Sequence, residues 1–373
     1  MFVLRYISAL VFLTVFSSFL SFTAQASDYK DALNSGFQKL YLQELNRYLA
    51  CREENAERCQ FGEVESYLDL MGLKKVRKTA PVKYPKSAQL KGYAAVVDSL
   101  ISINEDGSVE SVEVLYCSSG KGDPRLQFNW SEGGQYCSNF EKASVKAISE
   151  WEFKALPARL QSIPRKFQHR VVFSLPNQSS QDINIQITEL KKSQVRKIQK
   201  LTAAKEWSEL EAYALKNIDK NPVFRYYAAD SAWMMGNKAL AIERFTEFLE
   251  NGGNSYWHFG IKAAAIVIPH YYELGNDKKV VELGRPSLLG PYLREGNVVS
   301  KSAVAQAIIF YATSLMFQDK PEIAYALTRF KSLKKYGRRY GGITSDQMRV
   351  INEQIANLEA QVIKIGQSDS EAQ

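Results

Sequence analysis

The feature that most constrains the fold of this chain is a change of pattern at a polar break, residues 177–181. Before the break, runs rich in Val, Ile and Leu, such as 94–103 and 168–175, alternate with helical patterns. After it, over residues 189–365, apolar residues recur at the three- and four-residue spacing of helices, and we see no convincing pair of strands. The sequence therefore predicts an α+β unit followed by an all-α region.

Residues 1–26 have the pattern of a secretory signal. Arg5 precedes an almost wholly apolar run, 7–22, and Ala24-Gln25-Ala26 is a small-residue cleavage site. The apolar run is shorter than the ~20 residues that a membrane-spanning helix needs. We therefore expect export and cleavage, and an uncleaved membrane anchor is the alternative.

Export makes the four cysteines informative, because disulfides persist in oxidising compartments. Four cysteines allow three pairings, and we predict the local one, Cys51–Cys59 and Cys117–Cys137, which closes two surface loops. Neither pair has the Cys-x-x-Cys spacing of redox catalysts. The three histidines lie far from the cysteines in sequence, so no metal site is expected.

Residues 27–79 are expected to form a helical segment and a basic linker. Apolar residues at helical spacing predict a helix over 28–50, and a second, short helix over 63–71 is ended by Gly72. The charge run 74–78 is interpreted as a solvated hinge.

The α+β unit is expected to span residues 80–176. Asp-Gly supplies the positive φ values of a hairpin turn, and Asn139 is expected to cap a helix. The predicted elements follow in this order: helix 86–90, strand 94–103, hairpin turn Asp106-Gly107, a returning strand over 109–115, helix 140–151 and a last strand over 168–175.

Several short motifs occur in this unit in a fixed order: Tyr84-Pro85 with Ala88 and Gly92, the turn Asp106-Gly107, a helix with Phe140, Ala143 and Ala147 that runs into Trp151-Glu152-Phe153-Lys154, and the strand Val171-Val172-Phe173-Ser174-Leu175. The combination resembles the C-terminal domain of the TonB energy-transducer family, over about a quarter of the chain. Each of these residues also has a plain structural role in a small domain. They identify the resemblance and are not a site.

The resemblance implies a periplasmic protein-binding module. Members of that family bind a short N-terminal peptide of outer-membrane transporters as an extra strand at the edge of their sheet. The basic pair at the start of the matching edge could steer an acidic partner segment. The residues that this implies for partner binding are Arg165, Lys166, Phe167, Gln168, His169, Arg170, Val171, Val172 and Phe173.

The helical half, residues 185–366, resembles degenerate tetratricopeptide repeats, which are scaffolds for protein interaction. Small and large residues fall at that motif's positions, namely Ala229, Ala232, Gly236-Asn237, Ala241, Phe245 and Phe248. Turn signals at Asn221-Pro222, Gly275-Asn276 and Asp319-Lys320-Pro321 divide the region into helical hairpins. Residues 367–373 are expected to be a disordered tail.

Two surface hypotheses stay open in this half. An aromatic row either belongs to the core or lines a ligand groove: Tyr226, Tyr227, Trp233, Tyr271, Tyr272, Phe310 and Tyr311. A basic cluster is either a solvated face or a contact for lipid headgroups, cell wall or an acidic protein: Arg329, Lys331, Lys334, Lys335, Arg338, Arg339 and Tyr340.

These patterns favour a periplasmic binding protein that is part of, or accessory to, TonB-dependent energy transduction for outer-membrane transport. The eleven prolines form no Pro-rich spacer, so the usual mechanical route of the transducers is not expected. The alternative is an envelope scaffold with no transducer role, in which the α+β unit serves assembly or homodimerisation. No enzyme motif occurs, so neither catalysis nor a cofactor is expected. The net charge of +8 permits anionic partners, but nucleic acid is not expected outside the cytoplasm.

Overall fold

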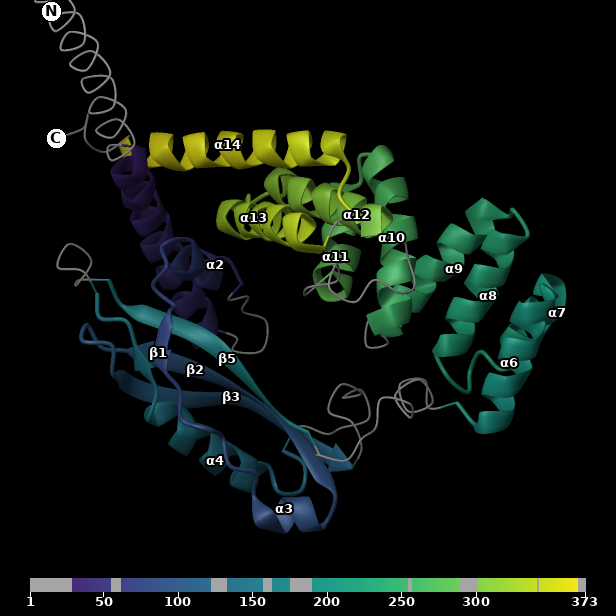
Figure 1. Cartoon of the computed structure of the whole chain (residues 1–373), viewed down its shortest axis with the longest axis horizontal. Coiled ribbons are helices and arrows are strands. Elements are labelled where there is room, and N and C mark those ends of the chain that lie inside the picture. Colours follow the sequence, from purple (N-terminus) through teal and green to yellow (C-terminus); the bar gives the residue numbers. More distant parts are fainter. Residues whose placement is uncertain are drawn as a thin grey trace, which may run out of the picture.

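The computed structural model describes residues 29–54, 62–121, 133–156, 163–174, 190–253, 257–288, 301–340 and 342–367. A unit with small antiparallel sheets is followed by an array of helices, as the sequence predicts, and the first helix runs from the end of α14 down to the sheet (Figure 1). The expected signal, the cysteine at position 59 and the residues from 368 onward lie outside the described residues. Within the described part of the chain, no helix is both long enough and apolar enough to cross a membrane.

The first helix spans residues 29–54, and α2 (Gly62–Leu70) follows it. The predicted apolar stripe of the first helix is buried at Phe37, Tyr41, Leu45 and Tyr48. Gly72 ends the α2 turn with a φ of +69°, a conformation that glycine adopts without strain. Both predicted helices of this segment are therefore confirmed.

The main sheet has three antiparallel strands in the order β3-β2-β5. The hairpin of β2 (Tyr93–Ile103) and β3 (Val109–Lys121) turns at Gly107, whose φ is +97°. The last strand, β5 (Arg165–Phe173), returns to pair with β2, which is thereby the central strand. A second sheet pairs β1 (Val76–Lys78) with β4 (Glu152–Phe153).

Both faces of β2 are buried, because different helices cover them. The helix α4 (Cys137–Ser149) packs on one face, where the Phe140 and Phe173 rings lie 4.7 Å apart. The first helix lies over the other face. The short helix α3 (Lys86–Leu90) also contacts β2, and its bounds match those predicted.

Two local predictions in this unit are wrong. Asn139 is not the cap of α4, because the helix already begins at Cys137 after Tyr136, which has a φ of +71°. The Asn139 side chain instead donates from Nδ2 to Ser87 Oγ at 3.0 Å. The charge run 74–78 is solvated as predicted at residues 75–78, which are exposed, but it is not a hinge, because β1 pairs with β4 and the ammonium of Lys74 lies 5.2 Å from the centre of the Phe167 ring.

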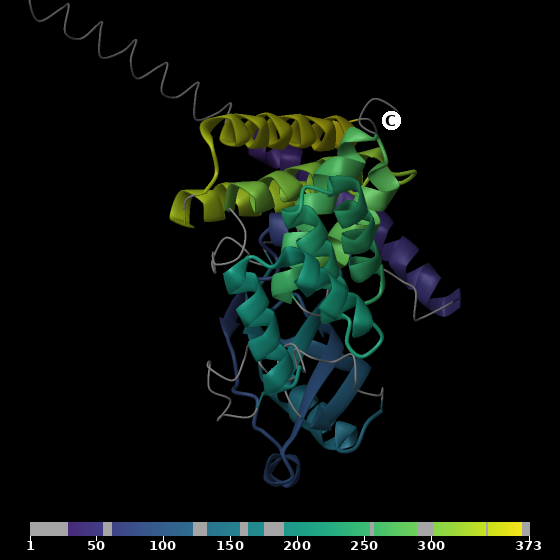
Figure 2. The ribbon, with the colours of Figure 1, turned by 90° about the vertical axis from the view of Figure 1, so that its right-hand side faces the viewer.

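The rest of the described chain is helical: α6 (Lys192–Ala204), α7 (Trp207–Lys216), α8 (Val223–Met234), α9 (Lys238–Glu250), α10 (Trp257–Glu273), α11 (Asp277–Ser287), α12 (Lys301–Ser314), the 3-10 turn η6 (Leu315–Phe317), α13 (Ile323–Tyr340) and α14 (Ser345–Gln367). Successive helices contact one another along the array, and Figure 2 shows the array stacked over the sheet unit. The predicted turns at Gly236 and Gly275 join helices, and Asn237 and Asn276 cap the helices that follow.

Candidate functional site

The outer edge of β5 is the site that the sequence predicts. β5 lies at the border of the three-stranded sheet and, among the described strands, pairs with β2 alone. Such an edge presents backbone N–H and C=O groups to which another strand can add. What this edge can do depends on which groups point outward and which are covered.

The contacts of Tyr41 in the first helix show which backbone groups of β5 point away from β2. Its hydroxyl donates to the carbonyl oxygen of Pro164 at 2.5 Å and accepts the N–H of Lys166 at 3.4 Å. Alternate residues of an antiparallel strand direct their backbone groups to opposite edges. The backbone groups of Gln168, Arg170 and Val172 therefore point to the same outer edge as those of Lys166.

The side chains of the nine predicted residues divide by position along the strand. Arg165, Phe167, Val171 and Phe173 are buried, whereas Lys166, Gln168 and His169 are half-buried. Arg170 and Val172 are exposed, and Val172 has 48% of its surface open. The end of β5 that follows Gln168 is thus its accessible half.

The steering role predicted for Arg165 does not fit its position. Its side chain is only 2% exposed, and its guanidinium donates to the carbonyl oxygens of Lys154, at 2.8 Å, and of Asn104. Burial lowers the pKa of Arg165. The residue links the hairpin turn to the segment after β4, and the sequence placed it at the surface because arginine is rarely buried.

Two further polar residues of the edge, Arg170 and His169, are compensated or shielded. Arg170 binds both carboxylate oxygens of Asp98, at 2.7 and 2.6 Å, and this hydrogen bonding raises the pKa of Arg170. The His169 ring lies 4.8 Å from that of Trp151, and burial together with the charge of Lys74 lowers the pKa of His169. At neutral pH the imidazole is therefore uncharged.

The first helix covers the other half of the edge and then leaves it. Beyond Tyr41, the Tyr48 hydroxyl accepts from Gln168 Nε2 at 3.4 Å. Further along, Arg52 binds both carboxylate oxygens of Glu113 on β3, at 3.1 and 2.6 Å. The helix thus crosses the sheet from β5 toward β3.

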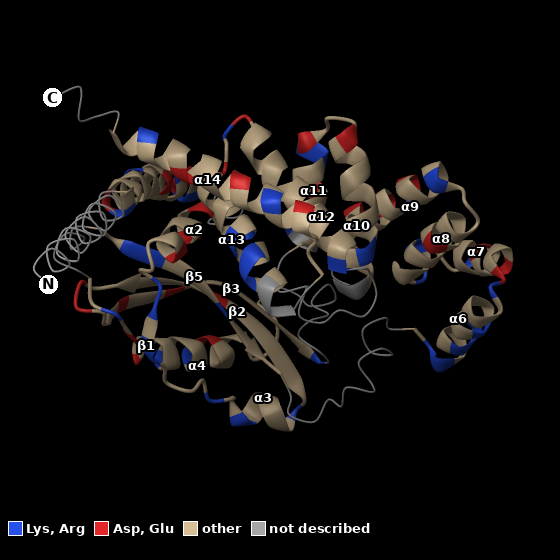
Figure 3. Cartoon of the chain, turned by 45° about the horizontal axis from the view of Figure 1, so that its top comes forward, with Lys and Arg blue, Asp and Glu red and all other residues tan. Residues whose placement is uncertain are grey.

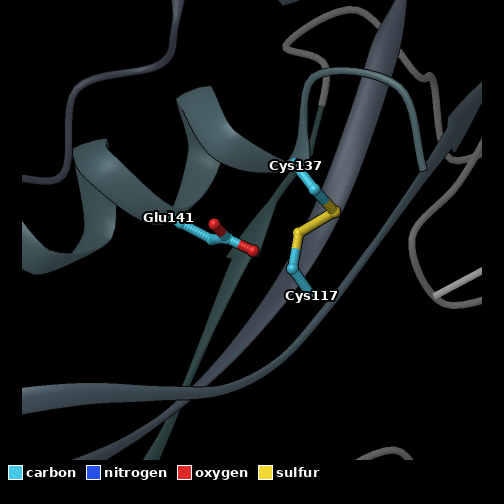
Figure 4. Close-up of side chains that lie close together, drawn as sticks. All are labelled: Cys117, Cys137 and Glu141. Atoms are coloured by element: carbon cyan, nitrogen blue, oxygen red, sulfur yellow. A yellow bond between two sulfur atoms is a disulfide. The ribbon is translucent and has the colours of Figure 1, made fainter. Parts of the chain in front are cut away.

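The predicted disulfide Cys117–Cys137 is confirmed and joins β3 to the first residue of α4. Glu141, one turn along α4, points its carboxylate toward the bond (Figure 4). Both sulfurs are held in the disulfide, so this cluster offers no thiolate to a metal ion. Cys51 is also disulfide-bonded, and its predicted partner lies outside the described residues.

A cavity of about 330 Å³ lies where the first helix, α2 and the start of α13 meet. Its lining is rich in charge: Glu44, Arg47, Tyr48, Cys51, Glu63, Lys320 and Glu322. The carboxylate of Glu63 accepts the backbone N–H groups of Ala324 at 2.9 Å and of Tyr325 at 2.8 Å. Burial raises the pKa of Glu63 to about 8. No signal in the sequence points to this contact, because it joins residues more than 250 positions apart.

The structure bears on both surface hypotheses of the helical half, the aromatic row and the basic cluster. Tyr226 and Tyr311 are buried and the rest of the aromatic row packs against the core, which favours a packing role. In the basic cluster, Lys331 pairs with Glu359 at 2.8 Å and Arg329 donates to the Tyr325 hydroxyl. In the ribbon of Figure 3, basic and acidic positions are interspersed along the helices of the array, as is ordinary for solvated helices.

Comparison with protein families, with curated proteins and with solved structures gives no match to this chain. Two features of the chain bear on its function. One is the set of motifs from Tyr84 to Leu175, and the other is the geometry of the β5 edge.

Proposed function

We propose that this chain is a periplasmic protein-binding module of the TonB type, part of or accessory to energy transduction for outer-membrane transport. It takes an extended segment of a partner protein as an added strand on β5. The observation that carries the proposal is the outer edge of β5, which is accessible at Arg170 and Val172. The proposal includes neither catalysis nor a cofactor.

The arrangement of the unit supports this proposal. The order helix, hairpin, helix and strand is the one that the resemblance implies, and the last strand lies at a border of the sheet. Sheet borders are usually blunted by charge, proline or a covering element. Val172 instead exposes a β-branched side chain beside outward-pointing backbone groups.

The helical array is proposed to act as a second surface for protein interaction. It resembles tetratricopeptide repeats in its small and aromatic residues, and its helices pack in succession from α6 to α14. In this proposal the module is released into the periplasm by cleavage after residue 26, and the array presents the edge within a larger envelope complex.

A proline pair tests strand addition at this edge. The Val172 N–H points outward, so V172P removes one donor from the outer edge and leaves the ladder with β2 intact. The Val171 N–H points toward β2, so V171P is the matched variant that damages the sheet itself. The ligands are short peptides from the N-termini of outer-membrane transporters.

We expect the wild-type protein to bind at least one of these peptides, and V172P to bind it at least about tenfold more weakly with an unchanged melting temperature. V171P is expected to melt at a lower temperature. Absence of binding by the intact protein, or equal binding by V172P, contradicts the proposal.

The alternative is an envelope scaffold in which two copies pair through their β5 edges. The same accessible edge favours it, because an open strand can pair with its own copy about a twofold axis. Sedimentation distinguishes the two functions. A wild-type dimer that becomes monomeric in V172P, together with no peptide binding, supports the scaffold.

A further inference from the structure

The Tyr41 hydroxyl occupies the β5 edge in the way that a residue of an added strand does. In a parallel ladder, an incoming residue donates to one carbonyl and accepts the N–H two positions further along. Tyr41 donates to the Pro164 carbonyl at 2.5 Å and accepts the Lys166 N–H at 3.4 Å. A hydroxyl can do both with a single oxygen atom. Because an antiparallel strand would need the same two groups, neither direction of pairing is open there.

The other half of the edge has no such contact among the described residues. Beyond its contact with Gln168 the first helix no longer follows β5, and its Arg52 is bound to Glu113 on β3. Arg170 and Val172 are the two residues of β5 with exposed side chains. Their outward-pointing backbone groups lie on the accessible half described above.

We infer that partner docking is confined to the half of the edge centred on Arg170 and Val172, and that Tyr41 closes the half at Pro164 and Lys166. This inference rests on the proposed function and adds to it the length and chemistry of the partner segment. Pairing with Gln168, Arg170 and Val172 takes an extended segment of about five residues, because alternate residues point outward.

The partner segment is recognised by shape and not by acidity. Arg165 is buried, and the charge of Arg170 is compensated by its two bonds to Asp98. Val172, with 48% of its surface open, favours a β-branched or aromatic residue opposite it. We therefore expect a weak dependence of affinity on salt, in contrast to the steering that the sequence suggests.

The first helix, which carries Tyr41 over the closed half of the edge, is held by contacts far from the sheet. Lys39 donates to the carbonyl oxygen of Ile365 at 3.2 Å, and the Tyr29 hydroxyl donates to Glu359 at 3.0 Å. Gly36 lies so close to the Val362 carbonyl of α14 that a Cβ would overlap it. Opening the edge at Lys166 by moving the helix would break these contacts, so the helical array holds Tyr41 in place.

The test maps which β5 amides a bound peptide protects from hydrogen exchange, by NMR on the full-length protein with the tightest-binding peptide of the transporter panel. In the wild-type protein we expect protection at Arg170 and Val172 and none added at Lys166. In Y41A, which removes the ring together with the hydroxyl, we expect protection to extend to Lys166, with about fivefold tighter binding, the effect of one further hydrogen bond. Y48A is the matched control, because the hydrogen bond between Tyr48 and β5 involves the Gln168 side chain.

Two kinds of failure can be told apart. If the peptide adds as much protection at Lys166 as at Val172 in the wild-type protein, or if Y41A has the same footprint and affinity as the wild type, the inference is overturned while strand addition stands. The wild-type footprint decides this even if Y41A does not fold. If no peptide protects any of these amides in the wild-type protein, the proposed function is overturned, and this inference with it.

Discussion

Replacing Glu63 by Gln is predicted to remove most of the pH dependence of stability between about pH 4.5 and 8. Glu63 is 7% exposed, and its carboxylate accepts the N–H groups of Ala324 and Tyr325. The first N–H groups of a helix have no partner within it, so Glu63 caps α13 from another element. Burial raises its pKa to about 8, while these two hydrogen bonds act in the opposite direction.

The magnitude follows from proton linkage. In the unfolded chain the Glu63 carboxyl loses its proton with a pKa near 4.5, and in the folded protein with a pKa of about 8. Between these values the folded state binds more protons, so stability falls as the pH rises. The loss in the free energy of unfolding over the whole interval is at most about 5 kcal/mol, because each pKa unit corresponds to about 1.4 kcal/mol.

The assay is urea unfolding at pH 5, 6.5, 8 and 9, followed by tryptophan fluorescence. E63Q keeps the shape, does not titrate, and accepts one N–H through its amide oxygen. At pH 5 we expect it to be about 1–3 kcal/mol less stable than the wild type, because one buried N–H loses its acceptor, and at pH 9 we expect it to be the more stable. E53Q, at an exposed position of the first helix, is the control and should follow the wild type at every pH.

One result would refute this reasoning. The free energy of unfolding of the wild type could change with pH in the same way as that of E63Q, or could rise with pH. In either case the two backbone hydrogen bonds from α13 would lower the pKa of Glu63 by as much as burial raises it, or by more. Glu63 would then be charged across the whole range.

The remaining predictions concern packing and covalent links. G36A is expected to lower stability by about 1–3 kcal/mol, because its Cβ would overlap the α14 backbone, whereas G62A, whose Cβ would make an ordinary contact at 3.9 Å with the Tyr325 ring, should cost far less; thermal melting compares the two. Replacing Cys117 and Cys137 together by Ser removes a link across 20 positions, and we expect a loss of about 3 kcal/mol in urea unfolding, with no further loss on adding reductant beyond any due to Cys51. R165M leaves the Lys154 carbonyl without the Arg165 donor, whereas the Asn104 carbonyl still accepts the Gly107 N–H at 3.1 Å; we therefore expect a loss of about 1–3 kcal/mol, while peptide binding at the accessible half of β5 persists in the folded fraction.

The elements that the sequence predicted correctly depend on local signals. The helix 86–90, the hairpin turn at Gly107 and the disulfide Cys117–Cys137 each follow from residues within about 20 positions of one another. The change from mixed to purely helical pattern near residue 177 also matches the structure. Such elements can be predicted because the residues that determine them lie within one turn or one hairpin, so distant contacts do not change the outcome.

The parts that could not be predicted depend on contacts between distant residues. From the sequence alone Arg165 is expected to be a surface cation. In the structure the β2–β3 turn and the segment after β4 enclose it. Tyr41 reads as one more residue of an apolar stripe, and its bond to Pro164 spans 123 positions. The sequence, through its resemblance, points to the edge strand, but which half of the edge is open depends on a helix that precedes it by more than a hundred residues.

The first helix also sets the order in which the chain can finish folding. Its partners include Glu359 and Ile365, which lie 330 and 326 positions further along. During synthesis, Phe37 of the apolar stripe can meet Tyr67 of α2 early, because their rings, 6.2 Å apart in the structure, belong to neighbouring helices. The contacts with Glu359 and Ile365 have to wait for α14, and closing so long a loop is slow. Complete docking of residues 29–54 is therefore expected to be a late step of folding.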